Sequence, residues 1–298
     1  MTGNQEPPVI GFVGLGRMGA PMARRLAAAG YRVRGFDTSA EARTALAAEL
    51  TVVDSLAELA EGAAVTILML PSSPVVRAVL VEDGLLAALP ANSLLVDMSS
   101  SEPMVTRELA DLTEERGITL LDAPVSGGVR GAEQGELTVM AGGPADRVGE
   151  IRPLLDVLGQ RVLHVGAVGA GHALKALNNL LSATHLLVSS EALLVGQAFG
   201  LDPQVMLDAI NGSSGRSGST EVKLPKFVVP GNFASGFGAG LMVKDMRIAV
   251  GLAEATGSPT PLGAAATELW RQAVTELPDD ADHTEVIRWL QRRDTQAR

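Results

Sequence analysis

The sequence predicts an α/β protein with two domains: an N-terminal doubly wound parallel sheet and an all-helical C-terminal domain, joined by a long helix. In the first half of the chain, short apolar runs alternate with segments of helical periodicity, beginning with residues 9–13. That alternation is typical of a parallel sheet covered by helices on both faces. After Gly171 only long helical patterns follow. The change places the boundary near 166–171, and we expect domains over residues 1–168 and 169–298.

Each apolar run of the first half has the length of one buried strand. The expected strands are residues 9–13, 32–36, 65–70, 94–97, 119–121, 138–141 and 162–165. The expected helices between them are residues 17–29, 40–49, 74–81, 103–115 and 145–157. In the second domain, helices are expected at 171–199, 203–210, 240–256, 261–276 and 283–293. The first of these is the predicted link between the domains.

Composition restricts the classes of partner. The chain has 298 residues and a formal net charge of −10, so it lacks the basic excess that nucleic acids and anionic membranes attract. It has no cysteine, which excludes disulfides and thiolate chemistry. Its four histidines lie far apart without metal-binding spacing, so we expect no metal. The polar start of the chain shows no secretory signal, and the apolar stretch 173–201 carries too many polar residues for a membrane span, so we expect a cytoplasmic protein.

A glycine-rich turn follows the first expected strand. Gly14, Gly16 and Gly19 form the pattern G-x-G-x-x-G between that strand and a helical pattern, and Asp37 closes the next apolar run. In a dinucleotide site the first glycine makes the tight turn and the second lets backbone approach the pyrophosphate. The third lets helix and strand pack closely, and the acid binds the ribose. The arrangement predicts a Rossmann-like domain that binds a dinucleotide. A glycine-rich turn with no nucleotide is the plainer alternative.

Loops of small polar residues follow three further expected strands. They begin at Met69, Asp97 and Asp122 and read MLPSS, DMSSS and DAPVSGG. Ligands of parallel sheets bind at the carboxyl ends of the strands, so these loops are candidates to contact a cofactor or substrate. Taken alone, each loop is better explained as an ordinary turn. Their recurrence at one edge of the sheet favours a site.

The start of the long helix carries a candidate catalytic lysine. Lys175 and Asn179 are four residues apart and therefore share a helix face, with Asn178 beside them. Burial in an apolar helix lowers the pKa of a lysine, which lets it exchange a proton near neutral pH. The two amides can hold a hydroxyl or carboxylate next to the ammonium group. The alternative is a lysine whose stem covers apolar surface while its charge reaches water.

Two other polar positions are weaker candidates. Lys244 and Asp245 lie on an apolar helix and are equally well read as an exposed pair near its start. Arg216 lies in a loop of small residues, where it is placed either to bind a substrate anion through two hydrogen bonds or to face solvent.

Four segments of the chain resemble the β-hydroxyacid dehydrogenase family, which includes 3-hydroxyisobutyrate dehydrogenase and tartronate semialdehyde reductase. They read GFVGLGRMG from Gly11, DAPVSGG from Asp122, GAGHALKALNN from Gly169 and LMVKD from Leu241, and they span nearly the whole chain in order. The resemblance implies a nicotinamide cofactor, NAD or NADP, a small anionic hydroxy-acid substrate, and a helical domain that forms homodimers or homotetramers. The loop SSGRSGST, from Ser213, departs from strict 3-hydroxyisobutyrate dehydrogenases and leaves the substrate's side group open.

The resemblance also implies a role for each matching residue. Lys175 matches the catalytic lysine and Asn179 its partner. The expected substrate-binding residues are Ser126, Gly127, Gly128, Asn178 and Arg216. The expected cofactor-binding residues are Gly14, Gly16, Arg17, Met18, Gly19, Asp37, Met69, Leu70, Pro71, Ser100, Lys244 and Asp245, the last two as a pair that closes over the site.

Asp37 favours NAD over NADP, because a carboxylate binds the ribose 2′-hydroxyl and repels a 2′-phosphate. NADP-preferring members of the family tend to carry Asn-Arg-Thr where this chain has Phe36-Asp37-Thr38. Two other functions remain as alternatives: an NADPH-dependent imine reductase, which generally lacks the lysine at position 175, and a non-catalytic NAD-binding regulator, which has no need of Lys175 or Asn179.

Overall fold

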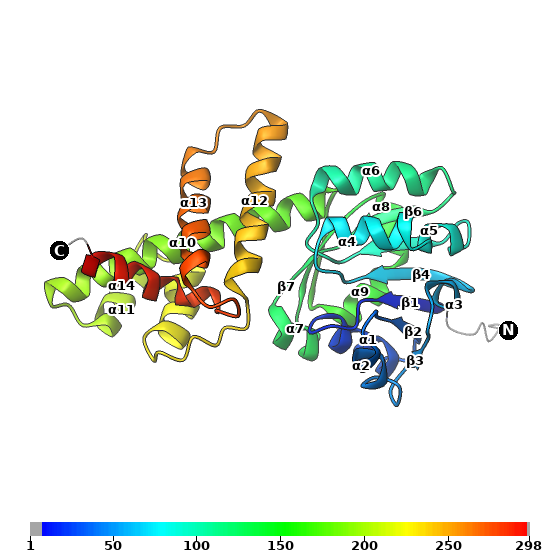
Figure 1. Ribbon diagram of the computed structural model, residues 1–298, viewed down its shortest axis with the longest axis horizontal. Helices are drawn as coiled ribbons and strands as arrows, with labels where there is room; N and C mark the ends of the chain where they lie inside the picture. Colours follow the sequence, from blue (N-terminus) through cyan, green and yellow to red (C-terminus); the bar gives the residue numbers. More distant parts are fainter. Residues whose placement is uncertain (1–7, 297–298) are drawn as a thin grey trace. The chain divides into compact units, whose positions relative to one another are not determined.

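The computed structural model describes residues 8–296, and this part of the chain divides into two compact units between Lys175 and Ala176. The division falls inside one continuous helix, α10 (Ala170–Phe199). The expected long helix is therefore present, and it begins in the first unit and runs through the second (Figure 1).

A nine-stranded sheet forms the centre of the first unit in the described part of the chain. Its strands are β1 (Val9–Val13), β2 (Arg32–Phe36), β3 (Thr51–Val52), β4 (Ala63–Leu68), β5 (Leu94–Asp97), β6 (Thr119–Asp122), β7 (Val125–Ser126), β8 (Thr138–Gly142) and β9 (Arg161–Gly166). The order is β3-β2-β1-β4-β5-β6-β8-β7, with β9 beside β8. Strands β1 to β6 are mutually parallel, as expected.

One edge of the sheet departs from the expected parallel arrangement. β8 pairs antiparallel with both β6 and β7, and parallel with β9. Only residues 127–137, which include the short helix α7, connect β7 to β8, and this connection is shorter than the dozen or more residues that a parallel crossover requires. Antiparallel edge strands on a mainly parallel sheet are common in such folds.

Helices cover both faces of the sheet (Figure 1). They are α1 (Gly19–Ala28), α2 (Ala40–Thr44), α3 (Leu56–Ala60), α4 (Ser73–Arg77), η1 (Ala78–Glu82), α5 (Leu85–Ala88), α6 (Pro103–Glu114), α7 (Gly128–Gln134), α8 (Ala145–Glu150) and α9 (Arg152–Leu158). Alternate residues of the strands point to opposite faces, so Val96 joins the core beneath α1 and α9, while Leu95 joins the core beneath α3 to α6.

Several short elements were not expected from the sequence. Strands β3 and β7 and helices α3, α5 and α7 are each seven residues or shorter. The expected helix 40–49 ends at Thr44, and the expected helix 145–157 is two helices that meet at Ile151. A few residues give too little periodicity to reveal an element, because a pattern needs two or more turns to repeat.

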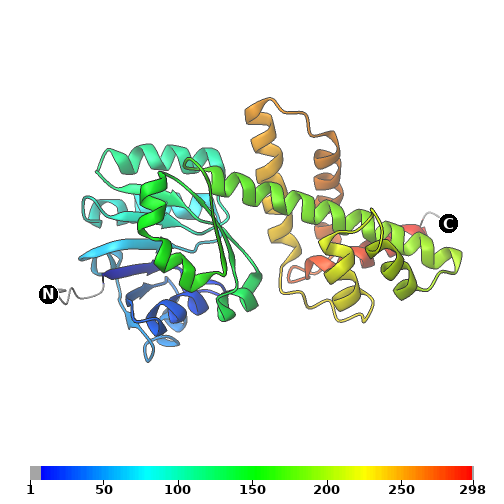
Figure 2. The same cartoon turned by 180° about the vertical axis from the view of Figure 1, so that it is seen from behind.

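The second unit is helical. After α10 come α11 (Pro203–Asn211), η2 (Ser219–Val228, π-helical), α12 (Ala239–Thr256), α13 (Pro261–Glu276), η3 (His283–Glu285) and α14 (Val286–Gln296). The core of the unit includes the fully buried Trp270 and Trp289. The Trp270 indole N–H donates to the Ala183 carbonyl at 3.2 Å, which fixes α13 against α10 (Figure 2). No helix in residues 8–296 is both long and apolar enough to cross a bilayer.

Candidate functional site

The glycine-rich turn between β1 and α1 requires glycine at two positions. Gly14 has a φ of +96°, and a Cβ there would overlap the carbonyl oxygen of Met69, which directly follows the neighbouring strand β4. A Cβ at Gly19 would overlap the carbonyl oxygen of Gly14. A Cβ at Gly16, in contrast, would meet nothing within 4 Å. Gly14 and Gly19 are therefore required by packing, whereas Gly16 leaves open space.

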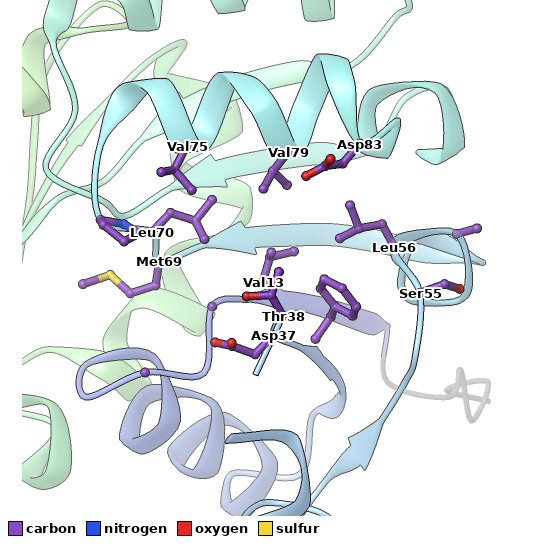
Figure 3. A pocket seen from close by; sticks show the side chains of 15 residues that line it. Val13, Asp37, Thr38, Ser55, Leu56, Met69, Leu70, Val75, Val79 and Asp83 are labelled. Atoms are coloured by element: carbon purple, nitrogen blue, oxygen red, sulfur yellow. The ribbon is translucent and has the colours of Figure 1, made fainter. Parts of the chain in front are cut away.

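That open space belongs to a cavity of about 690 Å³ at the carboxyl ends of β1, β2 and β4 (Figure 3). This volume is within the range of ligand pockets. The lining residues are Val13, Gly14, Gly16, Phe36, Asp37, Thr38, Ser55, Leu56, Ala57, Met69, Leu70, Pro71, Val75, Val79 and Asp83. Six of the expected cofactor-binding residues are among them: Gly14, Gly16, Asp37, Met69, Leu70 and Pro71.

Asp37 is fixed at the end of β2 by backbone donors. One carboxylate oxygen accepts from the Leu15 N–H at 2.7 Å and the other from the Ser39 N–H at 2.8 Å. The guanidinium of Arg34 points elsewhere, because it donates to the carbonyls of Glu58 and Glu61. The Asp37 side chain therefore presents a rigid carboxylate to the cavity.

Arg43 is a cation beside this site that the sequence reasoning missed. It donates to the Asp37 carbonyl at 2.7 Å and forms an ion pair with Asp54 at 3.4 Å. It lies in the short helix α2, six residues after Asp37, and no motif marks it. Asp37 therefore lines the cavity near the end of β2, and the Arg43 cation lies next to it outside the cavity wall.

The cavity fits a nicotinamide dinucleotide. The glycine turn has open space where a pyrophosphate needs it, the wall is mostly apolar, and the Asp37 carboxylate is placed for a ribose hydroxyl. Among the other expected contacts, Arg17 is exposed, Met18 packs against the core, and Ser100 is half-buried. These three are not part of the cavity wall.

A buried polar cluster in the first unit holds the start of α10. Both carboxylate oxygens of Asp122 accept backbone N–H bonds, from Gly169 at 2.7 Å and His172 at 2.8 Å. The imidazole of His172 is within hydrogen-bonding distance of the Thr106 hydroxyl, at 2.8 Å, and of the Ser99 carbonyl, at 3.1 Å. The cluster thereby anchors the helix turn that precedes Lys175.

Lys175 and Asn179 are both buried on α10, at 8% and 6% exposed. The Asn179 amide donates to the Asp245 carboxylate at 2.6 Å and accepts from the Asn178 amide at 3.1 Å. Asp245 is itself buried and forms an ion pair with Lys244 at 3.3 Å. Asp245 is therefore a partner of Asn179, not one of an exposed pair at a helix start.

The remaining expected substrate residues differ in setting. Gly127 and Gly128 are exposed at the start of α7, with φ angles of +136° and +64°, and Ser126 just before them is half-buried. Arg216 has a side chain that is 63% exposed and lies 3.8 Å from Glu221. The structure places Arg216 in solvent beside an acid.

A second lysine, not singled out from the sequence, is partly buried in the second unit. The Lys223 ammonium on η2 donates to the Ser182 hydroxyl on α10 at 2.6 Å. Burial lowers the pKa of Lys223 to about 8, an effect that Asp282 partly opposes. Burial, and then the nearby Lys223 charge, lower the pKa of His283 to about 4. The segment around Lys223 has no regular pattern in the sequence, so nothing in it marked this residue.

Comparison with known proteins places the chain in a family. Residues 9–166 match the NAD-binding domain of 6-phosphogluconate dehydrogenase, and residues 169–290 match the NAD-binding domain of NADP-dependent 3-hydroxyisobutyrate dehydrogenase. These two matches cover most of the chain, and together with the relatives below they show that the chain belongs to the β-hydroxyacid dehydrogenase family.

The relatives are similar over nearly their full length. A 2-(hydroxymethyl)glutarate dehydrogenase of Eubacterium barkeri is 39% identical, with 88% of this chain and 87% of the relative covered. A 3-hydroxyisobutyrate dehydrogenase of Pseudomonas aeruginosa is 39% identical, with 92% and 94% covered. The solved structure of a Mycobacterium tuberculosis 3-hydroxyisobutyrate dehydrogenase with L-serine has a TM-score of 0.90 at 36% identity, with 95% and 99% covered.

The particular activity follows from these relatives and the site. The chain is an NAD(P)-dependent oxidoreductase that acts on the hydroxyl group of β-hydroxy acids. Solved imine reductases share the fold at 19–21% identity, which shows the fold alone.

Proposed function

We propose that Lys175 is the general acid and base of this reaction, with NAD as the preferred cofactor. The observation that supports it is the burial of Lys175 one helical turn before Asn179, itself buried and bonded to Asp245. A bound nicotinamide supplies the hydride chemistry. The cavity residues Gly14, Gly16, Asp37 and Met69 to Pro71 would hold the cofactor, with Arg17, Met18, Gly19, Ser100, Lys244 and Asp245 as further proposed contacts.

In the proposed mechanism, Lys175 takes the hydroxyl proton during oxidation and returns it during reduction. Asn179 orients the hydroxyl, and its own orientation is held by Asp245. The backbone of Ser126 to Gly128 binds the carboxylate of the substrate, and Asn178 and Arg216 contribute polar contacts. Correct placement of these groups supplies most of the rate enhancement, because misaligned groups lose rate steeply.

Substitution of Lys175 tests this proposal. Lys175→Met keeps the apolar stem and removes the proton carrier, so kcat should fall about 10²- to 10⁴-fold, the range for general acid–base catalysis. The dissociation constant for NAD should stay within about twofold. Lys226→Met removes an exposed lysine of the second unit and should leave both quantities unchanged. A Lys175→Met enzyme of normal kcat would exclude the proposed role.

The substrate's side group is the open part of this function. The relatives are named for 2-(hydroxymethyl)glutarate and 3-hydroxyisobutyrate, and one structure contains L-serine. All three molecules share a hydroxymethyl group and a carboxylate, and they differ in the third substituent. We therefore propose a small substrate with this shared core.

The domain division at 168/169 and a cytoplasmic location stay predictions.

We also propose that the second unit forms a homodimer through α10. Large apolar side chains are exposed along one stripe of this helix, at Leu177, Leu181, Val188, Val195 and Phe199, and Phe199 is 84% exposed. Their separations of 4, 7, 7 and 4 residues are the spacing of a helix packing seam. Light scattering should show dissociation of Val195→Glu, whereas Gln197→Glu, off the stripe, should leave the assembly intact.

A further inference from the structure

The charge of the Lys223 ammonium is only partly balanced among the residues that the structure describes. An ammonium group has three hydrogen-bond donors, and here one of them is used by the Ser182 hydroxyl at 2.6 Å. No ion pair joins Lys223 to a described carboxylate. The side chain is half-buried. A cation partly removed from water without an opposite charge is costly, and an anionic ligand would offset that cost.

Asp282 is the acid whose charge acts on Lys223, and it already accepts hydrogen bonds from other groups. Asp282 accepts from the Ser235 hydroxyl at 2.8 Å, the Gly236 N–H at 2.8 Å and the Thr284 hydroxyl at 2.6 Å. Asp282 attracts Lys223 only enough to offset part of the effect of burial. The pKa of Lys223 at about 8 still leaves the group mostly cationic at neutral pH.

Ser182 places this cation beside the proposed site of chemistry. It follows Asn179 by three residues on α10, so the two side chains share a helix face. Three residues of helix advance about 4.5 Å along its axis. An anionic group bound by Lys223 and Ser182 would therefore lie a short carbon chain away from a hydroxyl held by Asn179.

We propose that Lys223 and Ser182 form a subsite for a second anionic group of the substrate. The enzyme then favours a β-hydroxy acid whose third substituent ends in a carboxylate over one whose third substituent is a methyl group. This inference rests on the proposed role of Asn179 in holding the hydroxyl. It concerns only the distal end of the substrate.

Two β-hydroxy acids that differ only in this third substituent test the subsite. 2-(Hydroxymethyl)glutarate and 3-hydroxyisobutyrate share the hydroxymethyl and carboxylate groups, and the first replaces a methyl group with a carboxyethyl group. We expect the wild type to have the higher kcat/KM for the dicarboxylate. Lys223→Met should lower that value at least tenfold, through KM, which corresponds to about 1.4 kcal/mol or more. It should leave kcat/KM for 3-hydroxyisobutyrate within about twofold.

Two control variants separate charge from folding. Lys226→Met removes an exposed lysine of the same helix and should leave kcat/KM for both substrates unchanged. Lys223→Arg keeps the charge and should retain part of the preference. If the wild type shows no preference, or if Lys223→Met lowers kcat/KM for both substrates equally, Lys223 is structural and the subsite does not exist.

Binding of glutarate gives a readout that does not require turnover. Calorimetry should detect glutarate binding to the wild type and at least tenfold weaker binding to Lys223→Met. If no β-hydroxy acid is oxidised, the proposed function fails while this titration still tests the subsite. If oxidation proceeds but glutarate binds both proteins equally, the subsite alone is wrong.

Discussion

The Asp122 carboxylate caps the helix that carries Lys175: its two oxygens accept the backbone N–H groups of Gly169 and His172, at 2.7 and 2.8 Å. Asp122 ends β6, so one side chain joins the sheet to the first turn of α10. Gly142 and Gly171 have no room for a Cβ beside it, since one at either position would overlap the carboxylate or nearby backbone. The cap is therefore built into tightly packed backbone.

Loss of this cap should reduce both stability and turnover. Asp122→Ala leaves two N–H groups without partners and should cost about 1–3 kcal/mol in the free energy of unfolding. As a positioning residue it should lower kcat while KM for NAD changes little, because the cofactor cavity does not include it. Urea unfolding and steady-state kinetics measure the two effects. Asp122→Asn keeps one acceptor and should therefore lose less stability and less kcat than Asp122→Ala. Asp111→Asn, at an exposed position, should change neither stability nor kcat.

The glycines of the turn should separate folding from cofactor binding. Gly16→Ala adds a methyl group to open space at the cavity wall, so we expect unchanged stability but at least tenfold weaker NAD binding. Gly19→Ala forces a clash with backbone and should destabilise the protein by about 1–3 kcal/mol. Fluorescence titration and thermal unfolding report the two effects. Gly149→Ala, also in open space but outside the cavity, should bind NAD normally; tight NAD binding by Gly16→Ala would contradict the assignment of the cavity.

Cofactor preference should depend on the balance of Asp37 and Arg43. Asp37→Asn removes the negative charge but keeps a side-chain oxygen for the Leu15 N–H, so the ratio of kcat/KM for NAD over NADP should fall about tenfold or more. Arg43→Gln should move the ratio in the opposite direction. Asp83→Asn changes another acid of the same cavity and should leave the ratio within about twofold. A wild type that prefers NADP would refute the role given to Asp37.

Acid should destabilise the second unit through His283. Burial holds the pKa of His283 at about 4, below the 6.5 of an exposed histidine. As the pH falls from 6.5 to 4 the unfolded chain takes up a proton that the folded chain excludes, so stability is lost over that range. The loss is up to about 3 kcal/mol. Urea unfolding at pH 7 and pH 5 should show a smaller difference for His283→Asn than for the wild type. The exposed His185→Asn should behave as the wild type does.

Local patterns in the sequence were sufficient to predict the Rossmann-like half, the long helix and the cofactor turn. These features are local: strand β1, the glycines after it and α1 are adjacent in the chain, and long helices repeat their pattern over many turns. The bounds of β1, β2 and β5 agree with the prediction to the residue. Lys175 and Asn179 could be paired because four residues always bring side chains together on a helix.

Contacts between residues far apart in the chain are visible only in the folded protein. The bond of Asn179 to Asp245 joins positions 66 residues apart, and that of Lys223 to Ser182 joins positions 41 apart. Neither spacing has a repeat that a sequence pattern could express. The antiparallel pairing of β8 with β6 and β7 likewise joins strands that no periodic pattern in the sequence places side by side. Contacts between segments that are distant in the chain, rather than local periodicity, therefore determine the partner of Asn179 and the surroundings of the Lys223 ammonium.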